Sequence, residues 1–242
     1  YDIIMVRIVL HTHPGEEAFA KIYEPLLGND QLGGLSLQMG NPYAAHAVTK
    51  KWVNLTQKSG APWIMTVDET GPWYRGLDPD TGFTVDDGKS HNHDSLRAYT
   101  LWGNLMAGGA GVEWYFGAKN ANNDLNAEDW RSRDAAWEWT ANTINFFQDN
   151  VPFAELDNHN ELVDGEAYCL SNTQGGYYLV YLPQGETTTL TTMPEDLGPL
   201  SIRWYQPAAN KYVDTEDLID HGGKVTLTPP DSSDWAVEVQ VL

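Results

Sequence analysis

Two adjacent carboxylates, Asp68 and Glu69, directly follow a short apolar run in the sequence. The run, residues 62–67, predicts a buried strand, and a Gly-Pro turn after the acids leads to the Trp-Tyr-Arg sequence of residues 73–75. In parallel α/β sheets, ligands bind and chemistry takes place at the carboxyl ends of the strands. An acid there, beside aromatic rings that can stack on a sugar, favours Glu69 as the nucleophile of a glycosidase. The alternative is structural, with the two carboxylates capping the next loop or holding Arg75.

A pair of histidines follows the first predicted strand. The apolar run 3–10 ends at His11-Thr-His13, and residues two apart share one face of an extended strand. A metal pair is one interpretation of this spacing. Catalytic zinc normally has three protein ligands, however, and no third ligand follows at a suitable spacing. We therefore expect His11 and His13 to line a polar pocket, and we expect no metal there.

Other candidate side chains also stand at the ends of predicted strands. The strand 34–38 ends at Gln38, and the strand 111–116 contains Glu-Trp-Tyr, which repeats the acid-plus-aromatic signature. Packing is the alternative role for Trp114, since side chains fill the interiors of barrels. Glu113 is a possible alternative acid, although nothing in its strand position assigns it that role. The predicted pocket residues are His11, His13, Gln38 and Asp68, and the predicted sugar-facing rings are Trp73, Trp114 and Tyr115.

Residues 76–93 form a polar stretch rich in aspartate, with Asp78, Asp80, Asp86 and Asp87. The stretch lacks the spacing and the closing glutamate of an EF-hand calcium loop. A solvated loop over the site is the expected structure, and bound calcium remains an alternative. The sequence predicts no cofactor.

The charge balance excludes some classes of partner. The chain of 242 residues carries 14 basic and 34 acidic side chains, so its formal net charge is −20. Such a chain repels nucleic acid and anionic membranes, and we expect neither as a partner. Its acidity is typical of a soluble secreted protein or of life in salt water. We expect an extracellular or periplasmic location, although no signal peptide precedes Tyr1.

The apolar pattern alternates between strand and helix in the first part of the chain and then changes. Strands are predicted at 3–10, 34–38, 62–67 and 111–116, and helices at 19–27, 45–55, 95–107 and 127–149. This alternation is the signature of a parallel sheet. From Pro152 the period becomes two residues, which predicts short strands at 166–171, 177–182, 200–205, 224–228 and 235–242. The sequence therefore predicts an α/β domain over 1–151 and an antiparallel β-sandwich over 152–242.

Several segments together resemble bacterial glycoside hydrolases of the apiosidase-like group. The most specific is Tyr-Thr-Leu-Trp-Gly-Asn-Leu-Met-Ala-Gly-Gly-Ala-Gly-Val-Glu-Trp-Tyr-Phe-Gly at 99–117. The supporting segments are Lys51-Trp52, residues 61–64, 68–71, 131–134, 146–147, 150–153 and 177–183. The resemblance runs essentially from end to end. It implies a (β/α)₈ barrel followed by a small β-sandwich that is catalogued as the collagen-binding domain of a collagenase.

The resemblance also implies which part of the barrel is present. The chain would begin near the fifth barrel strand, so the predicted strands would be strands five to eight, the C-terminal half of a TIM-type barrel. Glu69 would then close the seventh strand, as the nucleophile of a retaining hydrolase. The family's acid/base carboxylate belongs to the fourth strand, upstream of Tyr1. Because a retaining mechanism needs both carboxyl groups, we expect this chain alone to turn over poorly or not at all.

Two further expectations concern partners. A half-barrel leaves the edges of its first and last strands unpaired, and such edges seek partners. The sequence therefore predicts a companion N-terminal half-barrel or a second copy of the chain, besides a carbohydrate substrate. The alternative function is a non-catalytic carbohydrate- or collagen-binding module supported by a barrel remnant. The sugar, the linkage and exo or endo action are left open.

Overall fold

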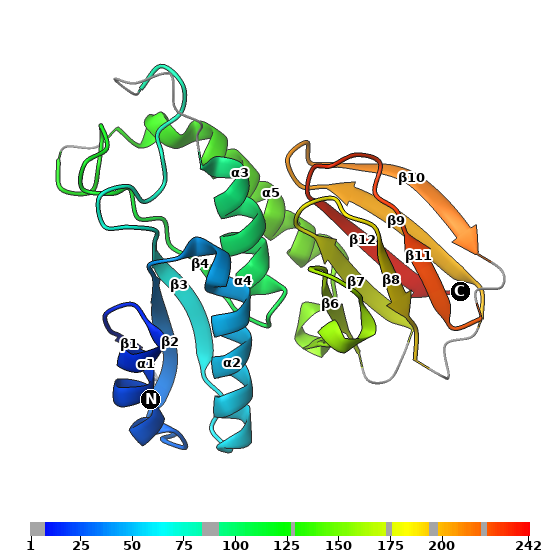
Figure 1. Cartoon of the computed structure of the whole chain (residues 1–242), viewed down its shortest axis with the longest axis horizontal. Coiled ribbons are helices and arrows are strands. Elements are labelled where there is room, and N and C mark those ends of the chain that lie inside the picture. Colours follow the sequence, from blue (N-terminus) through cyan, green and yellow to red (C-terminus); the bar gives the residue numbers. More distant parts are fainter. Residues whose placement is uncertain (1–7, 84–91, 127–128, 173–175, 194–197, 219–221) are drawn as a thin grey trace, which may run out of the picture. The chain divides into compact units, whose positions relative to one another are not determined.

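A computed structural model describes residues 8–83, 92–126, 129–172, 176–193, 198–218 and 222–242. The chain forms two compact units, Tyr1–Asp134 and Ala135–Leu242 (Figure 1). The sequence places its boundary later, at 151, whereas nearly all of helix α5 (Asp134–Asn150) belongs to the second unit. Residues 3–7 of the first predicted strand and two of the predicted loop aspartates, Asp86 and Asp87, lie outside the described residues.

The first unit is built on a four-stranded parallel sheet with the strand order β1-β2-β3-β4. Its strands are β1 (Ile8–His11), β2 (Leu32–Met39), β3 (Ile64–Thr70) and β4 (Gly111–Val112). Parallel neighbours need crossover connections, and helical segments supply them here. The prediction of a parallel sheet is confirmed. The strand predicted over 111–116 is shorter than expected, because β4 ends at Val112.

Helices connect the parallel strands. The helical segments of this unit are α1 (Glu16–Tyr23), η1 (Glu24–Leu26), η2 (Pro42–Ala44), α2 (Ala45–Lys58), α3 (His93–Ser95), η3 (Leu96–Trp102), α4 (Gly103–Leu105) and η4 (Trp130–Arg133). The segments α3, η3 and α4 follow one another without a break, and η3 is wound as a π-helix. None of the helices in the described part of the chain has the length and apolar character that crossing a membrane requires.

The parallel sheet has one buried apolar face and one open face. Side chains of α1 and α2 pack on the buried face, where the core residues are Phe19, Tyr23, Leu35, Leu37, Met39, Ala45, Trp52, Trp63, Met65 and Val67. Because side chains alternate along a strand, Ser36, Gln38 and Thr66 lie on the opposite face. Val9 and Ile64 are 54% and 53% exposed. Both belong to the open face, since Val9 pairs with Gly34 and Ile64 is two residues before Thr66.

The buried side chain of Asn104 joins helix α4 to two strands. Its Nδ2 donates to the carbonyl of Met65 at 3.3 Å and to the Thr49 hydroxyl at 3.1 Å. Its Oδ1 accepts a bond of 2.8 Å from the backbone N–H of Gly111. A Cβ on Gly109 would lie 2.3 Å from this Oδ1, so glycine is required there. The specific 99–117 segment thus contains the contacts that anchor β4 beside β3.

A second contact holds the same helix against α2. The Nδ1 of buried His46 donates to the carbonyl of Gly103 at 2.9 Å. Burial lowers the pKa of His46 to about 4, so the imidazole is neutral near pH 7. The two helices approach closely, since a Cβ on Gly103 would lie 3.5 Å from His46.

The second unit contains two antiparallel sheets. The larger has the strand order β10-β9-β12-β7-β6-β5, and the smaller pairs β11 with β8. The strands are β5 (Asp157–Asn158), β6 (Tyr168–Ser171), β7 (Tyr177–Leu182), β8 (Thr188–Thr191), β9 (Leu200–Gln206), β10 (Lys211–Leu218), β11 (Lys224–Leu227) and β12 (Trp235–Val241). The short helix η5 (Phe153–Glu155) precedes β5, and a second short helix, η6 (Asn160–Leu162), lies between β5 and β6. The five predicted strands are all present, and β5, β8 and β10 are additional.

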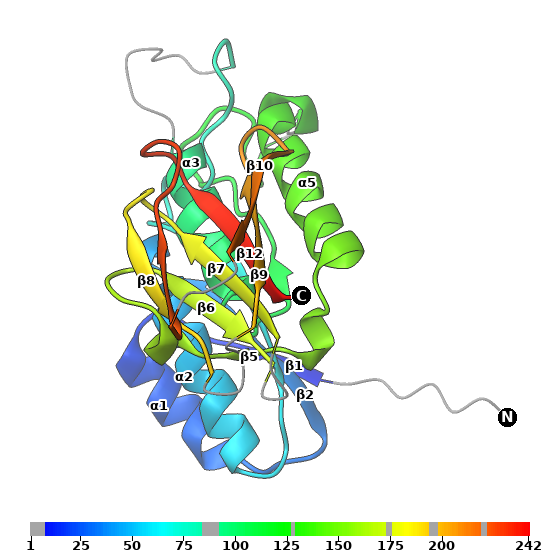
Figure 2. The same cartoon turned by 90° about the vertical axis from the view of Figure 1, so that its right-hand side faces the viewer.

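One hydrophobic core lies between these two sheets. It combines alternate residues of the larger sheet, such as Tyr178, Ile202 and Val237, with Leu190 and Val225 of the smaller one. The lone Cys169 belongs to the same core. On the other side of the larger sheet α5 lies beside β9 and β10 (Figure 2), where Phe146 stacks on Tyr205 with 4.3 Å between ring centroids.

We predict that Asn104→Ala destabilises the parallel sheet by about 2 kcal/mol, because the Gly111 N–H loses its acceptor and the Met65 carbonyl keeps only its bond from Ala110. Asn54→Ala, on an exposed position of α2, is the control and should change stability by less than about 0.5 kcal/mol. Hydrogen exchange of the β3 amides reports the free energy of local opening. Equal protection in both variants would contradict the anchoring role.

Candidate functional site

The two acids after β3 stand at an irregularity in the pairing with β2. Leu37 pairs with Val67, but Gln38 pairs with Glu69, so Asp68 is an extra residue at a β-bulge. Alternation from Thr66 places Asp68 on the open face of the sheet. Pairing with Gln38 places Glu69 on that same face. The bulge therefore directs two successive carboxylates to one side, which a regular strand does not do.

Asp68 is tied to both neighbouring strands. Its Oδ2 accepts a hydrogen bond of 2.8 Å from Nδ1 of His11, at the end of β1. The hydroxyl of Ser36 in β2 donates to the same oxygen. The Asp68 side chain is 18% exposed and that of His11 is 46% exposed. The first three strands thus meet in a polar cluster on the open face.

Glu69 is half-buried, and its side chain has no hydrogen bond or ion pair with any other described residue. Tyr115 is electrostatically coupled to it. Burial raises the pKa of the Tyr115 hydroxyl, and the negative charges of Glu69 and Asp124 add to the effect. The alternative in which the paired acids hold Arg75 is not what the structure shows, because Arg75 binds Asp78 at 2.6 Å. Glu69 is therefore a carboxylate without an assigned structural partner.

The loops after β3 and β4 are bonded to each other along their backbones. Leu77 N–H donates to the carbonyl of Tyr115 at 2.7 Å, and Ala118 N–H donates to that of Trp73 at 3.0 Å. A Cβ on Gly117 would lie 2.1 Å from the Arg75 carbonyl oxygen. This approach needs glycine both for space and for its φ of +76°. The loops that carry the aromatic residues therefore form one connected rim.

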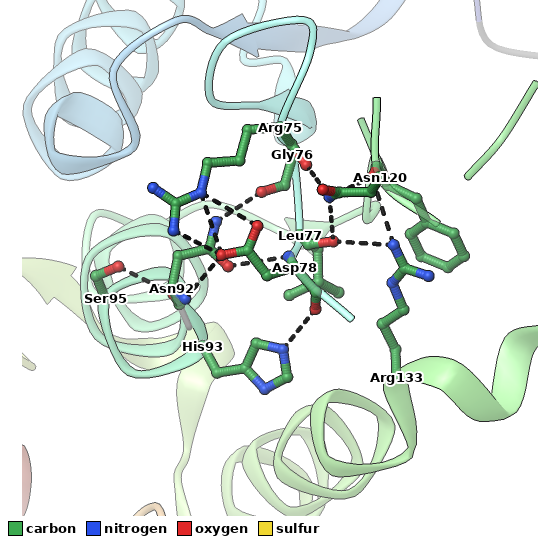
Figure 3. Close-up of polar contacts among 10 residues, drawn as sticks. Arg75, Gly76, Leu77, Asp78, Asn92, His93, Ser95, Asn120 and Arg133 are labelled. Atoms are coloured by element: carbon green, nitrogen blue, oxygen red, sulfur yellow. Dashed lines mark hydrogen bonds and ion pairs between the residues drawn. The ribbon is translucent and has the colours of Figure 1, made fainter. Parts of the chain in front are cut away.

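Polar side chains fix the inner part of this rim (Figure 3). The carboxylate of Asp78 binds Arg75, and its backbone N–H donates to the side chain of Asn92 at 3.0 Å. Asn92 in turn donates to the carbonyl of Gly76 at 2.6 Å, and His93 donates Nε2–H to the Asp78 carbonyl at 2.6 Å. Asp78 thus has a structural role within the described residues.

A buried arginine, Arg133, donates hydrogen bonds to the backbone of the rim. The guanidinium of Arg133 is fully buried and donates to the carbonyl of Asn122 at 2.6 Å. It bonds to the Leu77 carbonyl at 3.3 Å (Figure 3). It also lies 4.3 Å from the ring centroid of Phe116. Asn120 donates to the Phe116 carbonyl at 2.9 Å. Arg133 and Asn120 therefore connect the segments after β3 and β4 through backbone oxygens.

The predicted aromatic residues differ in exposure. Trp73 is 59% exposed and meets Tyr74 edge-to-face, with ring centroids 5.7 Å apart. The ammonium of Lys119 lies 5.3 Å from the Trp73 ring centroid. Tyr115 donates its hydroxyl to the Trp73 carbonyl at 2.5 Å. Trp114 is 8% exposed, which fits the packing alternative and leaves little of its ring for a sugar.

The remaining predicted residues are spread along the same edge of the sheet. His13 is exposed two residues after β1, and no described residue bonds to its side chain. Glu113 is exposed, and its backbone N–H donates to Val67 at 2.8 Å. A hollow of about 320 Å³ opens beside Gln38, and its other lining residues are Pro14, Gly15, Glu16, Phe19, Met39, Gly40, Asn41, Ala44 and Val48. Glu69 is not among them.

Three site features were not predicted from the sequence. Ser36 lies within a short apolar strand, and its two-residue spacing from Gln38 is the signal that places it on the open face. Tyr74 directly follows Trp73, and adjacency in the sequence does not indicate their edge-to-face contact. Lys119 has no local pattern that would reveal its position over Trp73. Within the described residues, no group of three or more His, Cys, Asp or Glu side chains could hold a metal ion.

Comparisons with known proteins agree with this architecture. Residues 156–240 match the family described as "Putative collagen-binding domain of a collagenase". A glycoside hydrolase family 5 structure from Bacteroides vulgatus aligns with a TM-score of 0.64 and 15% identity, covering 97% of this chain and 56% of its own. A search of curated proteins found no match.

Two other solved structures show similar alignments. One described as a glycoside hydrolase has a TM-score of 0.53 and 14% identity, covering 80% of this chain and 46% of its own. An Anoxybacillus α-amylase has a TM-score of 0.52 and 8% identity, covering 98% and 52%. The chain thus shares its fold with glycoside hydrolases, matches a family described as collagen-binding over residues 156–240, and spans about half the length of these structures.

We predict that Gly117→Ala destabilises the rim by about 2 kcal/mol more than Gly60→Ala. Both glycines have a positive φ, but a Cβ at Gly60 meets nothing within 4 Å, whereas one at Gly117 meets the Arg75 carbonyl. Both variants therefore share the conformational cost of a positive φ, and the difference between their stabilities reports the clash of the added Cβ at residue 117 with the Arg75 carbonyl. Hydrogen exchange at the amides of Leu77 and Ala118 measures the effect, and equal losses of protection would show that the loops are not held together there.

Proposed function

We propose that this chain is the C-terminal part of a retaining glycoside hydrolase in which Glu69 is the nucleophile. The observation that carries the proposal is the bulge at the end of β3, which places Glu69 on the open face without a partner among the described residues. The neighbouring rim offers the exposed ring of Trp73 to a sugar. The shared fold with glycoside hydrolases supports the same assignment.

The chemistry requires a second carboxyl group. The Glu69 carboxylate attacks the anomeric carbon while an acid gives its proton to the leaving oxygen, and the glycosidic C–O bond breaks. Water, deprotonated by that second group, then releases the sugar from the ester with Glu69. The two carboxyl groups of a retaining enzyme stand about 5–5.5 Å apart. We place the acid/base group outside this chain, with Glu113 as the alternative within it.

We further propose that β1 to β4 are the last strands of an eight-stranded barrel. The family 5 structure covers nearly all of this chain and has a further 44% of its own length outside the alignment, since 56% is covered. The exposed Val9 and Ile64 lie on the face that becomes the barrel interior in this arrangement. The outer edges of β1 and β4 pair with an N-terminal half-barrel or with a second copy of the chain.

We predict that the 242-residue chain, expressed by itself, associates through these edges, so that its mass by light scattering exceeds 27.0 kDa. Val9→Lys should shift the chain toward the monomer by placing a charge on the open face. Ile144→Lys, on an exposed position of α5, is the control and should leave the mass unchanged. A stable monomer with both edges unpaired would contradict the proposed association.

We predict that Glu69→Gln lowers kcat by about 10³-fold or more in a protein that joins this chain to its N-terminal half-barrel, because the amide cannot form the ester intermediate. Glu17→Gln, on exposed α1, is the control and should leave kcat unchanged. Release of aryl alcohol from a panel of aryl glycosides measures turnover. Hydrolysis that survives Glu69→Gln would remove Glu69 from the mechanism, and loss with Glu113→Gln would identify the second acid.

The family match of residues 156–240 favours a second candidate function, a non-catalytic module that binds glycan or collagen. Under this candidate the parallel sheet only supports the binding domain. A protein with a complete barrel that hydrolyses no glycoside, while its second unit retains glycan or collagen in a pull-down, would favour it. Either function suits an extracellular or periplasmic protein with a net charge of −20.

A further inference from the structure

We infer that Asp68 is a positioning residue that sets the tautomer of His11 and presents its Nε2 as an acceptor for a sugar hydroxyl, with Ser36 holding Asp68 in place. This inference rests on the proposed function for the identity of the ligand. The assignment of the His11 tautomer does not rest on it, because the protonation of a ring nitrogen can be measured without any substrate.

The geometry leaves one arrangement of donors and acceptors around Asp68. Its Oδ2 lies 2.8 Å from Nδ1 of His11, and the Ser36 hydroxyl donates to the same oxygen. His11 and Ser36 are paired positions of β1 and β2, so the strand register brings both to this carboxylate. The acceptor is a carboxylate, and therefore the nitrogen facing it carries the proton.

This proton defines the chemistry of the other ring nitrogen. In a neutral imidazole one nitrogen donates and the other accepts, so protonation at Nδ1 leaves a lone pair on Nε2. No described residue bonds to Nε2, and the His11 side chain is 46% exposed. A ring fixed in this way accepts a hydrogen bond from a hydroxyl group, and sugars present hydroxyl donors around their rings.

The bulge couples this acceptor to the nucleophile. Asp68 reaches His11 from the open face, and the extra residue at the bulge turns Glu69 to that same face. Glu69 directly follows Asp68, so the backbone that positions one carboxylate also positions the other. A sugar held by His11 through one hydroxyl is thereby positioned against Glu69. A hydroxyl held rigidly near the attacking oxygen supplies orientation, which is a large part of the catalytic effect of enzymes.

The direct test is the tautomer of His11 in the 242-residue chain, read from long-range ¹H–¹⁵N correlation spectra at a pH where histidines are neutral. His11→Gln assigns the signals among the seven histidines. We expect wild-type His11 to be protonated at Nδ1. Protonation at Nε2 in the wild-type chain would overturn the inference without the need for any variant.

Variants separate positioning from simple packing. Asp68→Asn keeps an oxygen that accepts from Nδ1–H, so the tautomer should be retained. Asp68→Leu removes the acceptor, and the proton should move to Nε2. Asp149→Leu, on an exposed position of α5, is the control and should leave His11 unchanged. A proton that stays on Nδ1 in folded Asp68→Leu would show that Asp68 does not set the tautomer. If that variant does not fold, Ser36→Ala serves instead, and broadening or mixing of the two tautomer signals is expected.

Activity in a protein with the complete barrel provides a second readout. Asp68→Leu should raise KM more than it lowers kcat. Asp68→Asn should bring KM back to within about threefold of the wild-type value, which corresponds to less than the 1.4 kcal/mol of a tenfold change. An unchanged KM in Asp68→Leu would show that the Asp68–His11 pair does not contribute to binding the sugar. Failure of the proposed function has a different signature, since Glu69→Gln would then leave turnover intact while the His11 tautomer stays as described.

Discussion

The pairing of β2 with β3 shifts by one residue at Asp68, and the site depends on this shift. A regular strand sends successive side chains to opposite faces, so one of two adjacent acids would enter the apolar core around Val67. Burying a lone carboxylate there would cost several kcal/mol. The extra residue avoids that cost and places both acids on the open face. Backbone register, rather than any single side-chain contact, thus sets the electrostatics of the site.

Different contacts hold the rim together. Its two loops meet backbone to backbone at Gly76 and Gly117, where each added Cβ would lie less than 3 Å from a carbonyl oxygen. The buried guanidinium of Arg133 then satisfies carbonyl groups that the loops leave unpaired. Trp73 is therefore exposed on a fixed support. Exposed aromatic rings on such supports bind with little loss of conformational entropy.

Periodicity and turn residues predicted most of the fold, because the parallel strands are continuous apolar runs and the later strands alternate. These patterns gave wrong predictions where tertiary contacts determine the structure. Val112 ends β4 although Trp114 and Phe116 continue the apolar pattern, and β10 forms despite three acidic residues, Asp214, Glu216 and Asp217. The sequence identified Asp68 and His11 separately. It could not reveal their hydrogen bond, because that contact joins β1 to β3 across residues far apart in the sequence.

The placement of α5 has a consequence for how the C-terminal unit can be transferred to other proteins. Phe146 of this helix stacks on Tyr205, and Asn142 accepts a hydrogen bond of 3.0 Å from Asn210. A graft that begins at the family match, residue 156, would leave those partners on the sheet uncovered. A portable version of this domain therefore starts at the amino terminus of the helix, next to the division between the two units at Asp134.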